Sequence, residues 1–175
     1  MTRRIAMWSG PRNISTALMR SWENRSDSEV VDEPLYAYYL QQTGLHHPGR
    51  REVLASQSQS WREVTRQLSG PAPSGADIWY QKHMTHHLLE PVGREWLRPL
   101  THAFLIREPR AVLSSYLRTR GEVRLEDLGF KQQAELFEWV RESTGHTPVV
   151  IDSADILQRP EPMLRALCSA LDVPF

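Results

Sequence analysis

The chain has 175 residues, of which 40% are hydrophobic, so it suits one domain with a sizeable buried core. Lysine plus arginine number 21 and aspartate plus glutamate number 21, and this formal charge of zero excludes the global basicity of a nucleic-acid-coating protein. Cys168 is the only cysteine, which excludes an intrachain disulfide and a cysteine-based zinc site.

The same features indicate where the protein works. A single cysteine fits a reducing cytosol. The apolar run at residues 5–8 stops at Ser9-Gly10-Pro11 and is too short for the apolar region of a signal peptide or for a bilayer span. We therefore expect a cytoplasmic protein that binds neither membrane nor nucleic acid.

Strand-like and helical patterns alternate along the chain. Short apolar runs predict five strands, at residues 4–8, 29–31, 78–82, 102–106 and 148–151. Apolar residues at helical spacing predict helices at residues 13–22, 35–40, 50–68, 109–120, 130–144 and 160–171. The Gly- and Pro-rich residues 69–76 are a connection, too short to separate domains. This order predicts one α/β domain with a central parallel sheet of about five strands and helices on both faces.

The loop after the first strand has the features of an anion site. In parallel sheets, ligands bind beyond the carboxyl ends of the strands, where helix N-termini present free N–H groups. Gly10 allows close approach of a ligand, Arg12 supplies a fixed positive charge, and Ser15 and Thr16 add hydroxyls. An ordinary turn capped by Asn13 or Ser15 explains the loop equally well.

This loop is not a nucleoside-triphosphate loop, which would read G-x-x-x-x-G-K-[ST]. Ser15 and Thr16 follow Gly10 without a second glycine and without the lysine that holds the β- and γ-phosphates. Only Asp152 offers a magnesium-binding aspartate at the end of an apolar strand, and an aspartate there is also a common helix cap.

A second anion signal follows the fourth strand. Arg107 stands where that strand ends, Pro109 is placed as the first helical residue, and Ser115 lies eight residues after Arg107. Taken alone, Arg107 is better explained by an ion pair with Glu108 or another carboxylate at the surface.

Together the two segments resemble the sulfotransferase family, enzymes of a P-loop-like three-layer α/β fold that use 3′-phosphoadenosine 5′-phosphosulfate. Residues 11–16 stand in the register of the loop that grips the 5′-phosphosulfate, and Arg107 and Ser115 match the spacing of the pair that binds the 3′-phosphate. Residues 149–175 are also similar to the family's late strand, acidic turn and final helix. The resemblance implies that the nucleotide contacts Gly10, Arg12, Asn13, Ser15, Thr16, Arg107 and Ser115.

Two departures from the family pattern matter. Arg12 replaces the usual lysine of the loop, which changes the geometry but not the charge at the leaving oxygen. Typical members continue to a C-terminal Arg-Lys-Gly type loop that covers the nucleotide. Because this sequence stops at Phe175, we expect a single sulfotransferase-like domain over residues 1–175 that lacks this cover.

Transfer of a sulfuryl group to a hydroxyl needs a base for the acceptor proton and requires no metal. Glu33 follows the second strand, where some relatives place a catalytic glutamate, although it could equally cap the next helix. Lys82 matches the lysine of the family's Lys-x-His stretch, and His86 is preferred over His83 as its histidine. The cluster lacks the H-E-x-x-H pattern of zinc sites.

These residues predict a sulfotransferase that moves a sulfuryl group from 3′-phosphoadenosine 5′-phosphosulfate to a hydroxyl or amine of a small-molecule acceptor by in-line displacement. The catalytic candidates are Arg12, Glu33, Lys82 and His86. One alternative is a kinase-like phosphotransferase, which would need magnesium and Asp152. The other is a binding module that keeps the nucleotide pocket without turnover.

Overall fold

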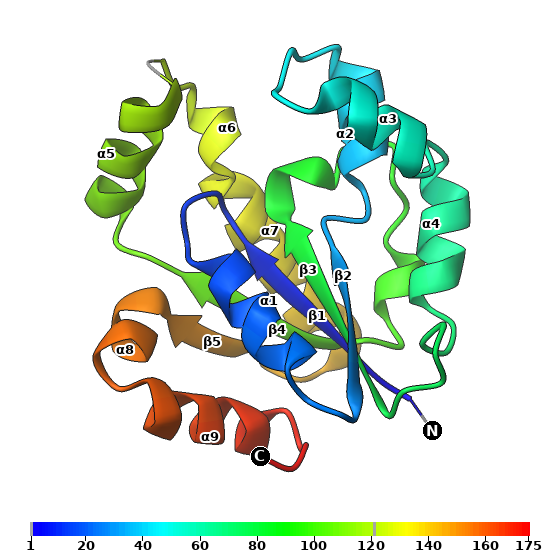
Figure 1. Ribbon diagram of the computed structural model, residues 1–175, viewed down its shortest axis with the longest axis vertical. Coiled ribbons are helices and arrows are strands. Elements are labelled where there is room, and N and C mark those ends of the chain that lie inside the picture. Colours follow the sequence, from blue (N-terminus) through cyan, green and yellow to red (C-terminus); the bar gives the residue numbers. More distant parts are fainter. Residues whose placement is uncertain (1, 121) are drawn as a thin grey trace.

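The computed structural model describes residues 2–120 and 122–175 and contains a five-stranded sheet (Figure 1). Its strands are β1 (Arg3–Ser9), β2 (Ser28–Asp32), β3 (Ile78–Met84), β4 (Thr101–Ile106) and β5 (Val149–Asp152). The strand order is β2-β3-β1-β4-β5, and every neighbouring pair is parallel. The predicted α/β fold with about five parallel strands is therefore confirmed.

The described helices include five of the six predicted ones, together with some short additions. They are α1 (Ser15–Glu23), α2 (Tyr36–Thr43), α3 (Arg50–Ser56), α4 (Trp61–Leu68), α5 (Pro109–Arg120), α6 (Leu125–Leu128), α7 (Phe130–Thr144), α8 (Ser153–Gln158) and α9 (Pro160–Ala170), with 3₁₀ turns η1 (Thr85–His87) and η2 (Glu95–Leu97). None of them combines the length and apolarity needed to cross a bilayer.

The single helix predicted over residues 50–68 is wrong, because the chain forms α3 and α4 instead. Gln57 ends α3 in an extended conformation, with φ −114° and ψ 150°. The Ser60 side chain then accepts a hydrogen bond from the Glu63 N–H at 3.4 Å and caps α4. Serine at such a position satisfies a helix start rather than a helix interior.

Helices cover both faces of the sheet, as the alternating pattern predicts. Ile5 and Met7 of β1 pack on the face covered by α1, α8 and α9. Ala6 and Trp8 point to the other face, where α7 supplies Leu136. On the same side, α4 packs against β3 beside the outer strand. In Figure 1, α1 lies in front of the sheet and α7 behind it. Because both faces are buried, the central strand β1 is apolar at successive positions.

Parallel pairing brings the carboxyl ends of β1, β3 and β4 to one edge of the sheet. Ser9 pairs with Met84 on one side and with Leu105 on the other. Gln133 of α7 donates hydrogen bonds to the carbonyls of Trp8 and Leu105, at 3.4 and 3.0 Å, and so fixes these strand ends from behind. The loops that follow the three strands are therefore neighbours.

Gly10 has a packing role that the sequence did not reveal. A Cβ atom at Gly10 would lie 2.5 Å from the carbonyl oxygen of Leu128. The loop after β1 thus rests directly on the backbone between α6 and α7, and only glycine permits this approach. The protein's own backbone therefore requires a glycine here, and the predicted contact of Gly10 with a ligand stays a prediction.

Candidate active site

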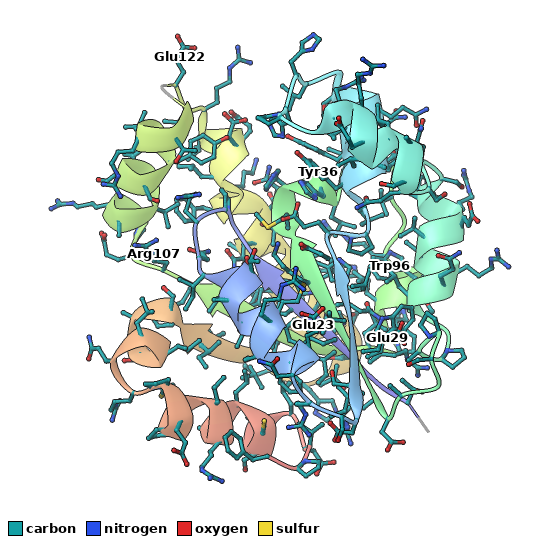
Figure 2. The ribbon with its side chains drawn as sticks, viewed as in Figure 1. Glu23, Glu29, Tyr36, Trp96, Arg107 and Glu122 are labelled. Atoms are coloured by element: carbon teal, nitrogen blue, oxygen red, sulfur yellow. The ribbon has the colours of Figure 1, made fainter. Side chains whose placement is uncertain are left out.

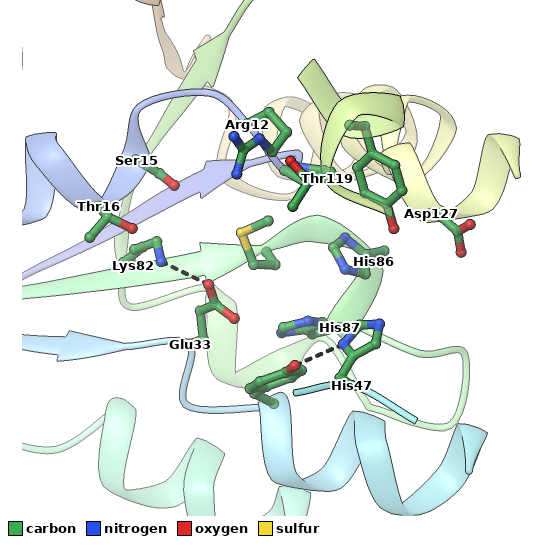
Figure 3. A pocket seen from close by; sticks show the side chains of 14 residues that line it. Arg12, Ser15, Thr16, Glu33, His47, Lys82, His86, His87, Thr119 and Asp127 are labelled. Carbon is green, nitrogen blue, oxygen red and sulfur yellow. Dashed lines mark hydrogen bonds and ion pairs between the residues drawn. The ribbon is translucent and has the colours of Figure 1, made fainter. Parts of the chain in front are cut away.

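One cavity of about 360 Å³ opens at the carboxyl ends of β1 and β3 (Figure 3). This is where ligands bind in open parallel sheets. Its walls come from the loop after β1, the segments that follow β2 and β3, and the helices α5 and α6. The lining residues are Pro11, Arg12, Ser15, Thr16, Glu33, Tyr36, His47, Lys82, Met84, His86, His87, Tyr116, Thr119 and Asp127.

The loop after β1 holds an unusual backbone. Arg12 and Ile14 both have positive φ, 64° and 56°. A β-branched residue in this region is strained, and such outliers cluster at ligand sites. Alternating left-handed positions make successive N–H groups converge on a concavity that suits an anion. Ile14 precedes α1 and provides no side-chain cap, so the helix begins with N–H groups that no described side chain satisfies.

The residues of this loop do not all face the cavity. Ser15 and Thr16 line it, and their hydroxyls have no hydrogen-bond partner among the described residues. The Asn13 side chain is only 1% exposed and points into the protein, where its Nδ2 lies 3.5 Å from the Leu105 carbonyl oxygen. Asn13 can therefore meet a ligand through its backbone alone. Neither Asn13 nor Ser15 caps α1, so the simple capped-turn explanation is wrong.

The second anion segment contacts the first. The Nε of Arg12 donates a hydrogen bond to the buried Ser115 hydroxyl at 2.9 Å, and Arg107 donates to the Arg12 carbonyl oxygen at 2.6 Å. Glu108 does not pair with Arg107, because its carboxylate caps α5 through the N–H groups of Arg110 and Ala111. Arg107 and Ser115 thus meet Arg12 from the α5 side, whereas Tyr36 lies toward α2 (Figure 2).

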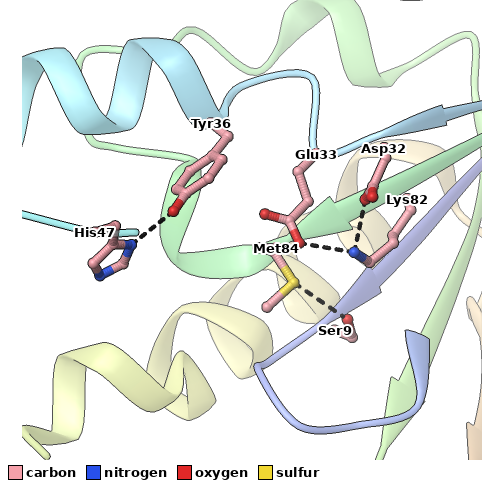
Figure 4. Close-up of polar contacts among 7 residues, drawn as sticks. All are labelled: Ser9, Asp32, Glu33, Tyr36, His47, Lys82 and Met84. Carbon is pink, nitrogen blue, oxygen red and sulfur yellow. Dashed lines mark hydrogen bonds and ion pairs between the residues drawn. The ribbon is translucent and has the colours of Figure 1, made fainter. Parts of the chain in front are cut away.

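Lys82 forms the charged centre of the cavity with two carboxylates, Asp32 at the end of β2 and Glu33 directly after it. Its Nζ lies 2.7 Å from both the Asp32 Oδ1 and the Glu33 Oε1 (Figure 4). Burial of Lys82, which is 3% exposed, acts to lower its pKa, but Glu33 and Asp32 outweigh burial and raise the pKa. Lys82 is therefore a permanent cation near neutral pH. The Glu33 side chain pairs with Lys82 and does not cap α2.

The histidines after Lys82 point to different places. His83 turns into the core and stacks on Trp8, with ring centroids 4.3 Å apart. His86 and His87 line the cavity. Burial lowers the pKa of His86 to about 4, although the Asp127 carboxylate opposes this shift. Burial also lowers the pKa of His87 well below its usual value, so both rings are neutral near pH 7.

Comparison with known proteins identifies the family. A sequence model of the sulfotransferase domain matches residues 3–175. The chain belongs to the sulfotransferase family. The resemblance drawn from the two anion segments is thereby confirmed.

Two curated relatives of this sulfotransferase domain come from Arabidopsis thaliana. Branched-chain-amino-acid aminotransferase-like protein 1 is 36% identical over 172 residues, and branched-chain-amino-acid aminotransferase-like protein 2 is 32% identical over 171 residues. The matches cover 98% of this chain but only 30% of each relative. An activity named for a whole relative is therefore not carried over to this domain.

Solved structures share the fold of this sulfotransferase domain. A sulfotransferase from Alicyclobacillus acidocaldarius has a TM-score of 0.68 and 11% identity, with 99% of this chain and 82% of that one covered. A mouse sulfotransferase complexed with PAP has a TM-score of 0.54 and 9% identity, with coverages of 99% and 59%. The shikimate kinase from Bacteroides thetaiotaomicron reaches 0.56 at 12% identity, with coverages of 98% and 99%. At these identities the likeness shows the fold alone.

Asp152 bears on the kinase alternative for this sulfotransferase domain. Its carboxylate accepts a hydrogen bond from the Ala154 N–H at 2.8 Å and caps α8. It ends β5, the edge strand, which β4 separates from β1, and it does not line the cavity. Its position is therefore explained by the helix cap. No group of three or more metal-ligating side chains occurs among the described residues.

Several cavity residues of this sulfotransferase domain were not found from the sequence as site residues. His47 and His87 line the end away from the loop, and Tyr116 and Asp127 come from α5 and α6. His87 had a signal, because it adjoins His86 after a strand. Asp127 had none, since α6 has four residues and shows no periodicity that places it.

Proposed function

We propose that this domain transfers a sulfuryl group from 3′-phosphoadenosine 5′-phosphosulfate to a hydroxyl or amine of a small-molecule acceptor by in-line displacement. The observation that carries the proposal is the junction of both anion segments at Arg12, which donates to Ser115 and accepts from Arg107. Arg12 also lines the cavity that holds Lys82 and His86. Donor and acceptor groups can therefore meet in one place.

The residues on the two sides of Arg12 suit the two anionic groups of the donor nucleotide, its 5′-phosphosulfate and its 3′-phosphate. The uncapped start of α1, with Ser15 and Thr16, suits the 5′-phosphosulfate. Arg107 and Ser115, on the other side of Arg12, suit the 3′-phosphate. The donor, when bound, supplies an activated sulfuryl group with a phosphate as leaving group. The Arg12 guanidinium would stabilise the charge on the leaving oxygen, an effect worth about 3 kcal/mol for one preorganised donor.

We assign His86 as the base that takes the acceptor proton. Its ring lines the cavity beside Lys82 and Glu33. Its lowered pKa keeps the ring unprotonated near neutral pH, which is the state a base needs. Glu33 is ion-paired with Lys82, so we assign this pair to holding charge at the reacting centre.

Calorimetric titration with 3′,5′-adenosine bisphosphate, with and without Mg²⁺, tests this proposal. We expect binding that does not depend on the metal, and loss of binding in Arg12→Ala. A strict requirement for Mg²⁺ would support a kinase-like phosphotransferase instead. Metal-independent binding without transfer to any acceptor would leave a nucleotide-binding module, and the proposed reaction would be wrong.

A further inference from the structure

The two ends of the cavity differ in charge. Arg12 and Lys82 lie toward the loop after β1, whereas Asp127 lies at the opposite end beside His86 and His47 (Figure 3). Among the described lining residues, Arg12 and Lys82 are the only arginine or lysine. The end away from the loop therefore has one lining carboxylate, Asp127, and no lysine or arginine among its described lining residues.

Lys82 does not supply that balance. Its ammonium group is bound by both Asp32 and Glu33, each at 2.7 Å, so the three groups together carry one net negative charge. Figure 4 shows the second carboxylate oxygen of Glu33 directed away from Lys82, toward Tyr36. Glu33 and Asp127 therefore present carboxylate oxygens to this end of the cavity, where buried surroundings screen charge less than water would.

His86 and His87 add no positive charge at this end, because burial lowers the pKa of both rings, and each has a nitrogen without a partner among the described residues. His87 is only 3% exposed and lines the cavity, yet its Nδ1 has no partner in the described part of the protein. The Nδ1 of His86 is also without a partner there. In a neutral imidazole one nitrogen accepts a hydrogen bond and the other donates one, so an unpartnered Nδ1 in the acceptor tautomer suits an N–H donor. Buried polar atoms of this kind require a partner.

Aromatic faces complete this end of the cavity. Tyr36 stacks on His87 with centroids 4.8 Å apart and an interplanar angle of 7°, and Tyr39 stacks on His87 at 4.6 Å. The Tyr36 hydroxyl lies 2.8 Å from the Nδ1 of His47, which holds the Tyr36 ring in place. An electron-rich ring beside a carboxylate attracts a cation. A volume of about 360 Å³ is at the small end for ligand pockets and suits a small acceptor.

From this arrangement we infer that the acceptor carries an ammonium group near the hydroxyl or amine that receives the sulfuryl group, and that Asp127 and the Tyr36 ring recognise it. This inference rests on the proposed function and names the substrate class of the same site. It predicts discrimination by charge between acceptors of one shape. An ammonium compound should bind about tenfold more tightly than its neutral analogue, and a carboxylate analogue should bind most weakly.

Three probes with a common phenol skeleton test the inference: tyramine as the cation, 4-ethylphenol as the neutral compound and 3-(4-hydroxyphenyl)propionate as the anion. Their Kd values are measured by calorimetry on protein saturated with 3′,5′-adenosine bisphosphate. Asp127→Asn keeps an oxygen for the Arg124 N–H that Asp127 now caps, so α6 should remain folded. We expect this variant to reduce the preference for tyramine to within about threefold.

Glu126→Gln is the matched control, because it removes one charge from an exposed residue of the same helix that does not line the cavity. It should leave the preference unchanged. Equal Kd values for the three probes, tightest binding of the propionate, or no binding of any probe to nucleotide-saturated protein would overturn the inference. Failure of the nucleotide itself to bind would instead overturn the proposed function, and the inference with it.

Discussion

Acid should destabilise this protein through His102, whose neutral form is fixed by its surroundings. The Trp8 Nε1–H donates to the His102 Nδ1 at 3.0 Å, and the His102 Nε2 lies 2.9 Å from the Leu97 carbonyl oxygen. Nδ1 must therefore accept and Nε2 donate, which is possible only for the neutral ring. Burial lowers the pKa of His102 to about 4, although the bond to Leu97 opposes this.

The size of the effect follows from proton linkage. An unfolded histidine takes up a proton below its ordinary pKa of about 6.5, while native His102 stays neutral until pH approaches 4. The unfolded state thus binds more protons in this window, so stability falls as pH falls. Between pH 7 and pH 5 this one group should remove about 2 kcal/mol from the free energy of unfolding. The figure depends little on the native pKa, provided that it lies below 5.

The assay compares the parent protein with His102→Asn by denaturant unfolding at pH 7 and pH 5, followed by tryptophan fluorescence. Asparagine does not titrate and still offers Trp8 an oxygen acceptor. The substitution itself lowers the free energy of unfolding at both pH values. This constant loss cancels, because the assay compares the change in the free energy of unfolding between pH 7 and pH 5. We expect that change to be about 2 kcal/mol smaller in the variant. An identical acid response in both proteins would refute the reasoning.

Three further substitutions test the loop and the charged centre. Arg12→Ala should lower kcat about 100- to 1000-fold with little change in stability, because one preorganised donor to the leaving oxygen is lost, and equal turnover would exclude that role. Lys82→Met should cost about 3 kcal/mol in denaturant unfolding, because two carboxylates lose their buried partner, and a neutral result would contradict this. Gly10→Ala should cost about 3 kcal/mol through its clash with the Leu128 backbone. Gly145→Ala, which meets open space at φ +72°, should cost about 1 kcal/mol, and an equal loss at both sites would refute the clash.

The sheet could be predicted from the sequence because its strands are buried on both faces. Residues 4–8 are apolar at almost every position, and the same holds for residues 102–106. Such runs between Gly- and Pro-containing turns leave few alternatives. Short elements carry less signal, since α6 has four residues and α8 has six. Their formation depends on capping and on packing against the rest of the fold.

The anion segments were visible in the sequence, but their mutual contact was not. Spacing marked Arg107 and Ser115 as a pair, whereas the structure shows that both meet Arg12. Asn13 illustrates the opposite case, because its side chain was a candidate helix cap and is instead buried against Leu105. Asp127 became part of the cavity only through the packing of α6. Contacts between distant segments depend on tertiary structure, which local patterns do not encode.

The central claim is that Arg107 and Ser115 form a 3′-phosphate site, and the selectivity for nucleotides tests it most directly. Calorimetry should show wild-type protein binding 3′,5′-adenosine bisphosphate about 10- to 100-fold more tightly than 5′-adenosine monophosphate, because a charge-assisted bond is worth about 1.5–3 kcal/mol. Arg107→Ala should remove most of this gap while leaving the monophosphate almost unaffected. Equal affinity of the wild-type protein for the two nucleotides would contradict the account.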